Sequence, residues 1–246
     1  MLIENKIVFI KIPKNASSSI YKSLVLNDFI IDEGHPYVTL ERNKSINLWK
    51  LQNQPLSLDN YHQTYNELNS FFPHKQYQYV GIKRDSTDRF ISAWKYMIMK
   101  FSEYPNIYPS YTNSTVDFSK FTTNEVIEFF KPIAIKMYSV NAGEVVGVIK
   151  EFFSSNTDEI SNSGFPQIIR NFQSQYYWGL GKCDLIFNYE ELNLFEKYIG
   201  DVFNKDFNLL HINDTQKIDI KLEKTKELVE FVEKYIDSPF TIKKML

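Results

Sequence analysis

Two short apolar runs, each followed closely by a helical pattern, constrain the fold of this chain most strongly. Residues 7–12 are apolar and β-branched apart from one lysine, they end at Pro13, and residues 17–26 follow with helical spacing. Residues 77–83 form a second such run, and apolar side chains then recur at helical spacing over 85–100. Repeated strand–turn–helix units favour parallel strands covered by helices. The sequence therefore predicts an α/β fold with a parallel sheet flanked by helices.

The remainder of the chain continues this organisation without a repeat or a linker that would divide it. We expect a loop over 102–114, a short strand over 184–188, and helices over 124–130, 190–203 and 221–236. Hydrophobic residues make up 43% of the 246 residues, which is enough to build a sizeable core. We therefore expect a single domain spanning residues 1–246.

Composition excludes several classes of protein. The formal net charge is −2, so bulk electrostatics do not favour nucleic acid as a partner. Cys183 is the only cysteine, which excludes an intramolecular disulfide and a cysteine zinc site, and we expect it to be a small buried apolar residue. No apolar run approaches the ~18 residues of a membrane span. Because no signal-peptide pattern stands at the N-terminus, we expect a cytoplasmic protein. We also expect no bound metal.

The first strand–helix junction, residues 13–19, carries the chemistry of a phosphate cradle. The backbone N–H groups and the dipole at the start of the helix favour an anion. Lys14 adds a positive charge, and Ser17, Ser18 and Ser19 add hydroxyl donors. The glycines of a Walker A loop are missing. The plain alternative is a helix start capped by small polar residues, with solvated serines.

The second junction places arginine where the chain otherwise uses lysine. Only four arginines occur, and two of them, Arg84 and Arg89, lie close together at the end of the second strand. The guanidinium group has the planar, forked geometry that suits a phosphate. Ser92 follows Arg84 by about two helical turns. We expect Arg84 and Ser92 to bind one phosphate, and Arg89 to support the loop.

The first junction resembles a loop of known function. Residues 13–19 are similar to the 5′-phosphosulfate-binding loop of sulfotransferases that use 3′-phosphoadenosine 5′-phosphosulfate (PAPS), whose pattern is close to Pro-Lys-Thr-Ala/Gly-Ser/Gly-Thr-Ser. The form nearest to this one is that of the carbohydrate sulfotransferases of the heparan/uronyl 2-O type. Asn15 and Ser18 stand where threonine is usual, and both keep a polar side chain.

The second junction resembles the 3′-phosphate motif of the same family, Arg-Asp-Pro-x-x-Arg-x-x-Ser-x-Tyr/Trp. The matching residues are Arg84, Asp85, Arg89, Ser92 and Trp94, while Ser86 replaces the proline. Two looser similarities follow, in residues 175–192 and 210–213. The segments between these motifs match nothing in the family's pattern.

The resemblance implies a PAPS-dependent sulfotransferase with a P-loop-like sheet, which transfers a sulfuryl group to a hydroxyl, with a carbohydrate as the expected acceptor. The implied partners are thus the nucleotide cosubstrate and a glycan or another hydroxyl acceptor. Lys14 would neutralise charge on the leaving phosphate. The implied cosubstrate-binding residues are Lys14, Asn15, Ala16, Ser17, Ser18, Ser19, Arg84 and Ser92, with the backbone N–H groups of residues 15–19 on the 5′-phosphate.

A base that accepts the hydroxyl proton is also implied, and histidine is the usual one near neutral pH. In the 2-O type relatives, the catalytic histidine lies before the 3′-phosphate strand, and His62 has that position. His35, His211 and a carboxylate such as Glu33 or Glu67 stay open as alternatives. His74 has the sequence context of a turn residue.

Two other functions compete with this reading. A nucleotide-dependent kinase or hydrolase of the P-loop type would share the strand–loop–helix unit, but the sequence lacks the Walker A glycines and an evident magnesium-binding acid. An inactive glycan-binding relative would keep the fold without turnover. For an active enzyme, the low net charge predicts a neutral or lightly charged glycan as the acceptor.

Overall fold

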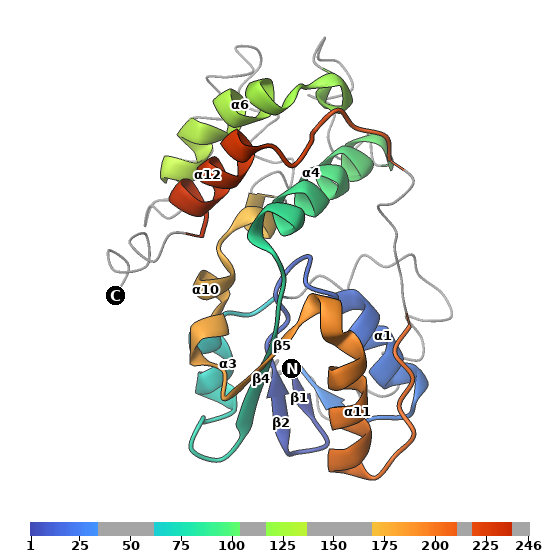
Figure 1. Ribbon diagram of the computed structural model, residues 1–246. Coiled ribbons are helices and arrows are strands. Elements are labelled where there is room, and N and C mark those ends of the chain that lie inside the picture. The colour runs from blue at the N-terminus through green and yellow to red at the C-terminus, as the bar shows by residue number, and fades with distance from the viewer. Residues whose placement is uncertain (34–61, 104–116, 137–168, 211–217, 238–246) are drawn as a thin grey trace. The chain divides into compact units, whose positions relative to one another are not determined.

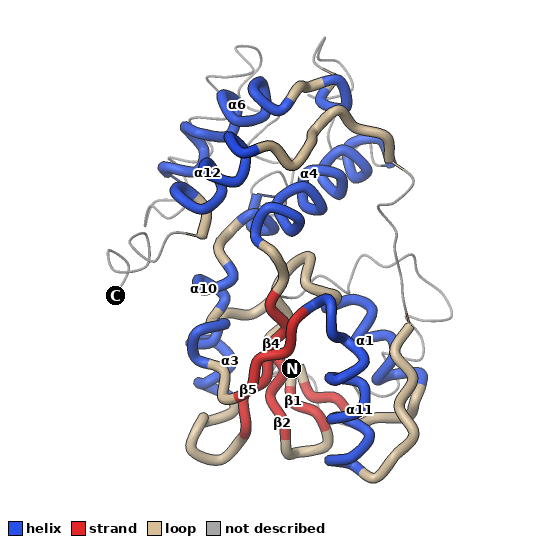
Figure 2. Tube along the Cα trace, viewed as in Figure 1, coloured by secondary structure: helices blue, strands red, loops and turns tan. Residues whose placement is uncertain are grey.

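A computed structural model of the chain describes residues 1–33, 62–103, 117–136, 169–210 and 218–237. The chain divides into two compact units, each built from two segments. The first consists of Met1–Arg84 and Gln175–Ile212, and the second of Asp85–Ser174 and Asn213–Leu246. Every described strand lies in the first unit, and the described part of the second is helical (Figure 2). The single domain expected from the sequence stays a prediction.

The first unit is built on a sheet of five described strands. Their order is β3 (Ile31–Asp32), β1 (Leu2–Ile3), β2 (Ile7–Phe9), β4 (Gln78–Lys83) and β5 (Leu185–Asn188). The strands β2, β4 and β5 run parallel, as predicted, with Val8 opposite Tyr79 and Ile82 opposite Phe187. The strand β1 pairs antiparallel with both β2 and β3, so the sheet is mixed rather than parallel throughout. Strands of two residues are too short to show a hydrophobic period in the sequence.

Helices cover both faces of this sheet because its strands alternate apolar side chains between two cores. On β2, Ile7 and Phe9 face one core, and Val8 and the following Ile10 face the other. The first core is covered by α1 (Ser17–Leu26) and α11 (Leu192–Phe203). The second is covered by α3 (Tyr65–Phe71) and α10 (Gln175–Trp178). Figure 1 shows the pair α1 and α11 on the side of the sheet opposite α3.

The elements that carry the two junctions agree closely with the sequence patterns. The helix predicted over 17–26 is α1, and the strand predicted over 77–83 is β4. The strand predicted over 7–12 ends earlier, at Phe9, although the N–H of Ile10 still donates to the Val80 carbonyl over 2.9 Å. Short 3₁₀ turns precede β5 and α11: η3 (Leu180–Lys182) and η4 (Tyr189–Glu191).

The described part of the second unit packs helices around one apolar core. Its helices are α4 (Ser86–Glu103), α6 (Thr123–Lys136) and α12 (Lys226–Tyr235), with 3₁₀ turns η1 (Phe118–Lys120) and η2 (Arg170–Phe172). Along α4, the buried Phe90, Trp94 and Met97 recur at helical spacing and line this core. The helices predicted over 85–100, 124–130 and 221–236 are therefore confirmed, with shifted ends. Most of the loop predicted over 102–114 lies outside the described residues.

Across the described ranges, no helix has both the length and the apolar character that a membrane span requires.

Gly81 lies in the middle of β4, where the sheet leaves no room for a side chain. A Cβ atom at this position would lie 2.9 Å from the sulfur of Cys183 and 3.1 Å from Cδ1 of Leu180. Cys183 itself is partly buried against this core, and the loss of solvent raises the pKa of its thiol to about 12. The thiol therefore serves as apolar packing, as the sequence predicts.

We expect Gly81→Ala to lower the free energy of unfolding by about 1–3 kcal/mol, because it overpacks a filled site. Removing the sulfur with Cys183→Ala should recover part of this loss. Urea unfolding of both single variants and the double variant measures the coupling. Strictly additive effects would mean that the two side chains do not compete for the same space.

Candidate functional site

The loop between β2 and α1 has a backbone that alternates between two conformations. Lys14 and Ala16 have φ values of 66° and 60°, in the left-handed region that L residues rarely adopt. Asn15 between them has no positive φ, and Ser17 begins α1. Alternation of this kind is typical of backbone nests, in which N–H groups gather on one concave side and can bind an anion. The local geometry is therefore suited to a phosphate.

The start of α1 has no side-chain cap. Ala16 occupies the cap position, its side chain makes no hydrogen bond, and its carbonyl accepts the first bond of the helix from Ile20 N–H over 2.9 Å. The N–H groups of Ser17, Ser18 and Ser19 precede this ladder and lie at the positive end of the helix dipole. The alternative of a start capped by a polar residue is therefore wrong, because the cap residue is an alanine.

The first junction and Arg84 of the second lie together in the first unit. Because β2 and β4 are parallel neighbours, their carboxyl ends meet at one edge of the sheet. Nη1 of Arg84, which directly follows β4, donates to the carbonyl oxygen of Lys14 over 2.9 Å. The guanidinium group also stacks on Tyr189, 4.3 Å from the ring centroid. The edge of the guanidinium group is thus held by the loop, and its face is held by Tyr189.

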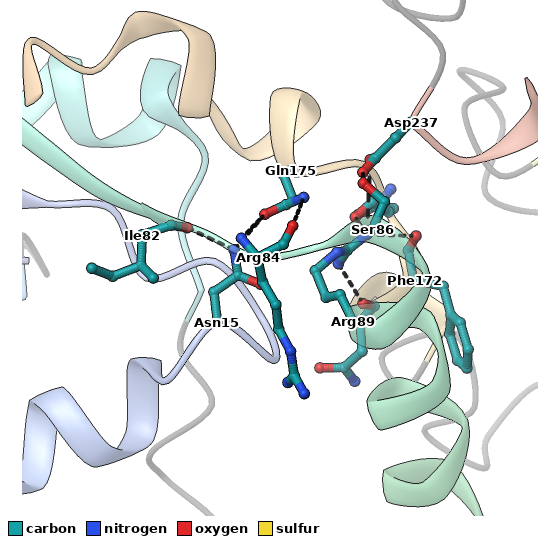
Figure 3. Close-up of polar contacts among 10 residues, drawn as sticks. Asn15, Ile82, Arg84, Ser86, Arg89, Phe172, Gln175 and Asp237 are labelled. Atoms are coloured by element: carbon teal, nitrogen blue, oxygen red, sulfur yellow. Dashed lines mark hydrogen bonds and ion pairs between the residues drawn. The ribbon is translucent and has the colours of Figure 1, made fainter. Parts of the chain in front are cut away.

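Gln175 joins the same cluster, although the sequence patterns predict no role for it. Its Oε1 accepts from the backbone N–H of Arg84 over 2.9 Å, and its Nε2 donates to the Arg84 carbonyl over 2.8 Å. Oε1 also accepts from Nδ2 of Asn15 over 2.6 Å (Figure 3). The same Nδ2 donates to the Ile82 carbonyl over 2.6 Å. In the sequence, Gln175 is marked only as the first residue of the looser similarity over 175–192.

Arg89 and Ser92 lie on α4, in the second unit. The fully buried Arg89 donates to the carbonyls of Asn171, Phe172 and Gln173 over 3.0, 3.3 and 2.8 Å, at the end of η2. One of its guanidinium nitrogens lies 4.0 Å from the Asp237 carboxylate. Arg89 therefore supports the end of η2, and its expected support of the loop stays a prediction. Ser92 is buried, with 9% of its surface exposed, and its predicted contact with a phosphate stays a prediction.

His62 is held in one tautomer by a backbone carbonyl. Its Nδ1 lies 2.6 Å from the carbonyl oxygen of Lys11, which can only accept. The proton of the neutral ring is thus on Nδ1, and the lone pair is on Nε2, where the ring can take up a second proton. The ring also packs near Trp178, with the centroids 5.9 Å apart. This tautomer suits the role of base that the sequence predicts.

The carboxylates that were alternatives to His62 have structural partners. Glu33 accepts from the ammonium group of the buried Lys11 over 2.9 and 3.0 Å. Glu67 closes a capping box with Thr64 at the start of α3. The alternatives His35 and His211 lie outside the described residues.

His74 has a structural setting, in line with its sequence context. Its two ring nitrogens lie 2.9 Å from the Tyr65 hydroxyl and 2.9 Å from the Asp184 carboxylate. Burial raises the pKa of Asp184, but hydrogen bonds from the Tyr79 N–H and from His74 outweigh it and hold the pKa below its usual value. His74 therefore fastens α3 to the residues around β4 and β5.

The cluster offers cations and N–H donors rather than metal ligands. Within the described ranges, no group of three or more histidine, cysteine, aspartate or glutamate side chains could hold a metal ion.

Comparison with known proteins decides the family. A family model described as the sulfotransferase family matches residues 3–193, well over half of the chain. The chain belongs to the sulfotransferase family. It is therefore a transferase of sulfuryl groups, and its mixed α/β architecture, with a sheet flanked by helices, agrees with that assignment. No curated protein and no solved structure matches the chain.

The matched range includes the residues that contact one another around the loop of residues 13–19. Lys14, Asn15, Arg84 and Gln175 all lie within the matched range.

The left-handed backbone of Ala16 gives a test of the loop conformation. We expect Ala16→Gly to change the free energy of unfolding by no more than about 1 kcal/mol, because glycine removes the strain but also a packed methyl group. Ala16→Val should lower it by at least about 2 kcal/mol, since a β-branched residue fits this region poorly.

Chemical unfolding measures both changes in the sulfotransferase. Lys22→Val, on the same helix, is the control, and it should cost only about 0.5 kcal/mol of helix propensity. Equal losses for valine at positions 16 and 22 would contradict the left-handed conformation of Ala16.

Proposed function

We propose that this sulfotransferase moves the sulfuryl group of PAPS to a hydroxyl of a carbohydrate. The observation that carries the proposal is the turn between β2 and α1, in which left-handed residues alternate with Asn15 and the helix starts without a side-chain cap, a backbone suited to an anion. Its contact with Arg84 supports a single nucleotide site with two anion-binding parts, because a cation from the next strand lies against the same loop. The family supplies the sulfuryl chemistry.

The 5′-phosphosulfate is assigned to the loop. In this assignment, the N–H groups from Ala16 to Ser19 and the serine hydroxyls bind the phosphate and sulfate oxygens. The N–H of Asn15 is left out of this set, unlike in the sequence prediction, because it donates to the Ile12 carbonyl over 3.3 Å. The side chain of Asn15 is buried against Gln175 and the Ile82 carbonyl. The ammonium group of Lys14 neutralises charge on the oxygen that bridges phosphorus and sulfur.

The 3′-phosphate is assigned to Arg84. Its guanidinium group is only partly buried and keeps donors beyond the one that binds the Lys14 carbonyl. Stacking on Tyr189 fixes the plane of this group, which favours recognition of a phosphate by two parallel hydrogen bonds. Ser92 is the second ligand that the sequence motif implies.

The reaction in this proposal is an in-line displacement at sulfur. The acceptor oxygen forms a bond to sulfur while the bond from sulfur to the bridging oxygen breaks, and adenosine 3′,5′-bisphosphate leaves. Nε2 of His62 takes the proton of the hydroxyl, in the tautomer that the Lys11 carbonyl selects. Lys14 and the N–H groups of the loop stabilise the charge that develops on the leaving phosphate.

A carbohydrate of low charge is the proposed acceptor. The carbohydrate class rests on the loop's similarity to carbohydrate sulfotransferases, and the low charge rests on the net charge of −2. The direct assay incubates the protein with ³⁵S-labelled PAPS and a panel of neutral glycans, heparin-like polymers, lipids and phenols. Label on a neutral glycan supports the proposal, while label only on phenols or on heparin-like polymers contradicts the acceptor class.

Two variants separate the catalytic roles. His62→Ala should lower kcat by about 10²–10⁴-fold, the contribution of a positioned base, while PAPS affinity stays nearly unchanged. Lys14→Ala should weaken PAPS binding and also lower kcat by about 10²–10³-fold, because its charge acts in the ground state and more strongly in the transition state.

Steady-state kinetics and calorimetric titration with adenosine 3′,5′-bisphosphate measure these effects. The acid limb of the pH–rate profile should also disappear in His62→Ala, since only the wild type depends on a neutral imidazole. Normal turnover of His62→Ala would rule out His62 as the base, and normal turnover of Lys14→Ala would overturn the proposed function.

The assignment of Arg84 is tested with one nucleotide that carries the 3′-phosphate and one that lacks it. Arg84→Ala should weaken adenosine 3′,5′-bisphosphate binding by about 1.5–3 kcal/mol, and Ser92→Ala by about 0.5–1.5 kcal/mol. Adenosine 5′-phosphosulfate lacks the 3′-phosphate, so its affinity should hardly change. Equal losses for both nucleotides would place Arg84 away from the 3′-phosphate.

A further inference from the structure

A small cluster of buried amides lies behind the residues that would contact the nucleotide. We call Asn15 and Gln175 the amide pair; each has only 1% of its surface exposed. Nδ2 of Asn15 donates to Oε1 of Gln175, and each side chain also binds the backbone at the end of β4 (Figure 3). Side chains this buried act through the residues that they hold.

Gln175 holds the backbone of Arg84 as a neighbouring strand would. Its amide offers one acceptor and one donor, which bind the N–H and the carbonyl of Arg84 over 2.9 and 2.8 Å. Arg84 lies just beyond the last residue of β4, so this pairing continues the ladder by one residue. The direction in which the Arg84 side chain leaves the backbone is thereby fixed.

Asn15 holds the loop at the point where its φ values change sign. Both hydrogens of its Nδ2 are used, on the Ile82 carbonyl and on Gln175, each over 2.6 Å. A threonine hydroxyl, which the similar loops have at this position, carries a single hydrogen and could not make both bonds. This chain therefore fastens its loop with an amide and matches it with a buried glutamine.

Arg84 connects Gln175 to the loop that carries Asn15 by a second route. The guanidinium group donates to the carbonyl of Lys14, one of the two residues with left-handed backbone. The loop and Arg84 thus constrain each other through a closed ring of contacts: Asn15 to Gln175, Gln175 to Arg84, and Arg84 back to the loop. A change at either amide is transmitted to both parts of the nucleotide site.

We propose that Asn15 and Gln175 are positioning residues that hold the loop and Arg84 in register, and so set the enzyme's preference for nucleotides with a 3′-phosphate. The inference rests on the proposed function, in which Arg84 binds that phosphate. Removing Gln175 leaves two polar backbone groups of Arg84 and an amide hydrogen of Asn15 without their partner, so Arg84 loses its fixed direction.

The test compares the affinities of adenosine 3′,5′-bisphosphate and adenosine 5′-monophosphate by calorimetry. The preference is measured as the dissociation constant of adenosine 5′-monophosphate divided by that of adenosine 3′,5′-bisphosphate. In Gln175→Leu, we expect this ratio to fall by about tenfold or more, the range for lost hydrogen bonds to a charged group. A purely structural role would change both affinities or the stability and leave this ratio intact. Gln173→Leu is the matched control, because Gln173 is also buried but makes none of these contacts, and its ratio should stay at the wild-type value.

Arg84→Ala distinguishes failure of the inference from failure of the proposed function. If Arg84→Ala abolishes the preference for the 3′-phosphate and Gln175→Leu keeps it, the inference alone is overturned. If Arg84→Ala itself keeps the preference, the assigned role of Arg84 fails and the inference fails with it. In the double variant, Gln175→Leu should cause no further change in the ratio, since its effect acts through Arg84.

Gln175→Glu and Asn15→Thr keep the inference testable if Gln175→Leu does not fold. Gln175→Glu retains the acceptor for Arg84 N–H and for Asn15 but loses the donor to the Arg84 carbonyl. Asn15→Thr retains one donor of two. Each should lower the ratio by about threefold or more, and a wild-type ratio in both variants would overturn the inference.

Discussion

The parallel pairing of β2 with β4 is the contact on which the candidate site depends. Val8 lies opposite Tyr79 and Phe9 opposite Val80, so both strands deliver their carboxyl ends to the same edge of the sheet. The loop of residues 13–19 follows one strand and Arg84 follows the other. The register is held by the two apolar cores, because a shift by one residue would exchange the side chains that face α1 and α11 with those that face α3 and α10.

Beyond the last ladder bonds, polar side chains replace strand pairing. The backbone at the end of β4 is bound by the amides of Asn15 and Gln175, since buried peptide groups without partners cost about 1–3 kcal/mol each. The arrangement is not fully satisfied: among the described residues, the buried Oδ1 of Asn15 has no hydrogen-bond partner. Together with the left-handed Lys14 and Ala16, this indicates a loop held in a costly conformation by its surroundings, as is common at binding sites.

The two arginines of the second motif have separate tasks. Arg84 lies at the edge of the sheet with its guanidinium group on Tyr189 and the loop carbonyl of Lys14. Arg89, one turn into α4, is fully buried and binds three successive carbonyls at the end of η2. The fork of Arg89 thus fixes the segment that leads in the chain to Gln175, whereas that of Arg84 stays partly exposed. A buried guanidinium group requires several acceptors, and the ends of a 3₁₀ turn provide them.

Periodicity and strand-end chemistry are local properties of the chain, so features that depend on them could be predicted from the sequence alone. These features are the α/β class, the parallel core of the sheet, the helices α1 and α4, and the two junctions. The sequence could not find β1 and β3, whose two residues show no period. It also could not assign Gln175, whose partners Asn15 and Arg84 are distant in sequence and are chosen only when the strands pair. The tautomer of His62 was likewise set by the Lys11 carbonyl, and the cap of α1 by the backbone turn at Ala16. These features depend on which buried polar groups meet in the folded chain, and only the tertiary structure decides that.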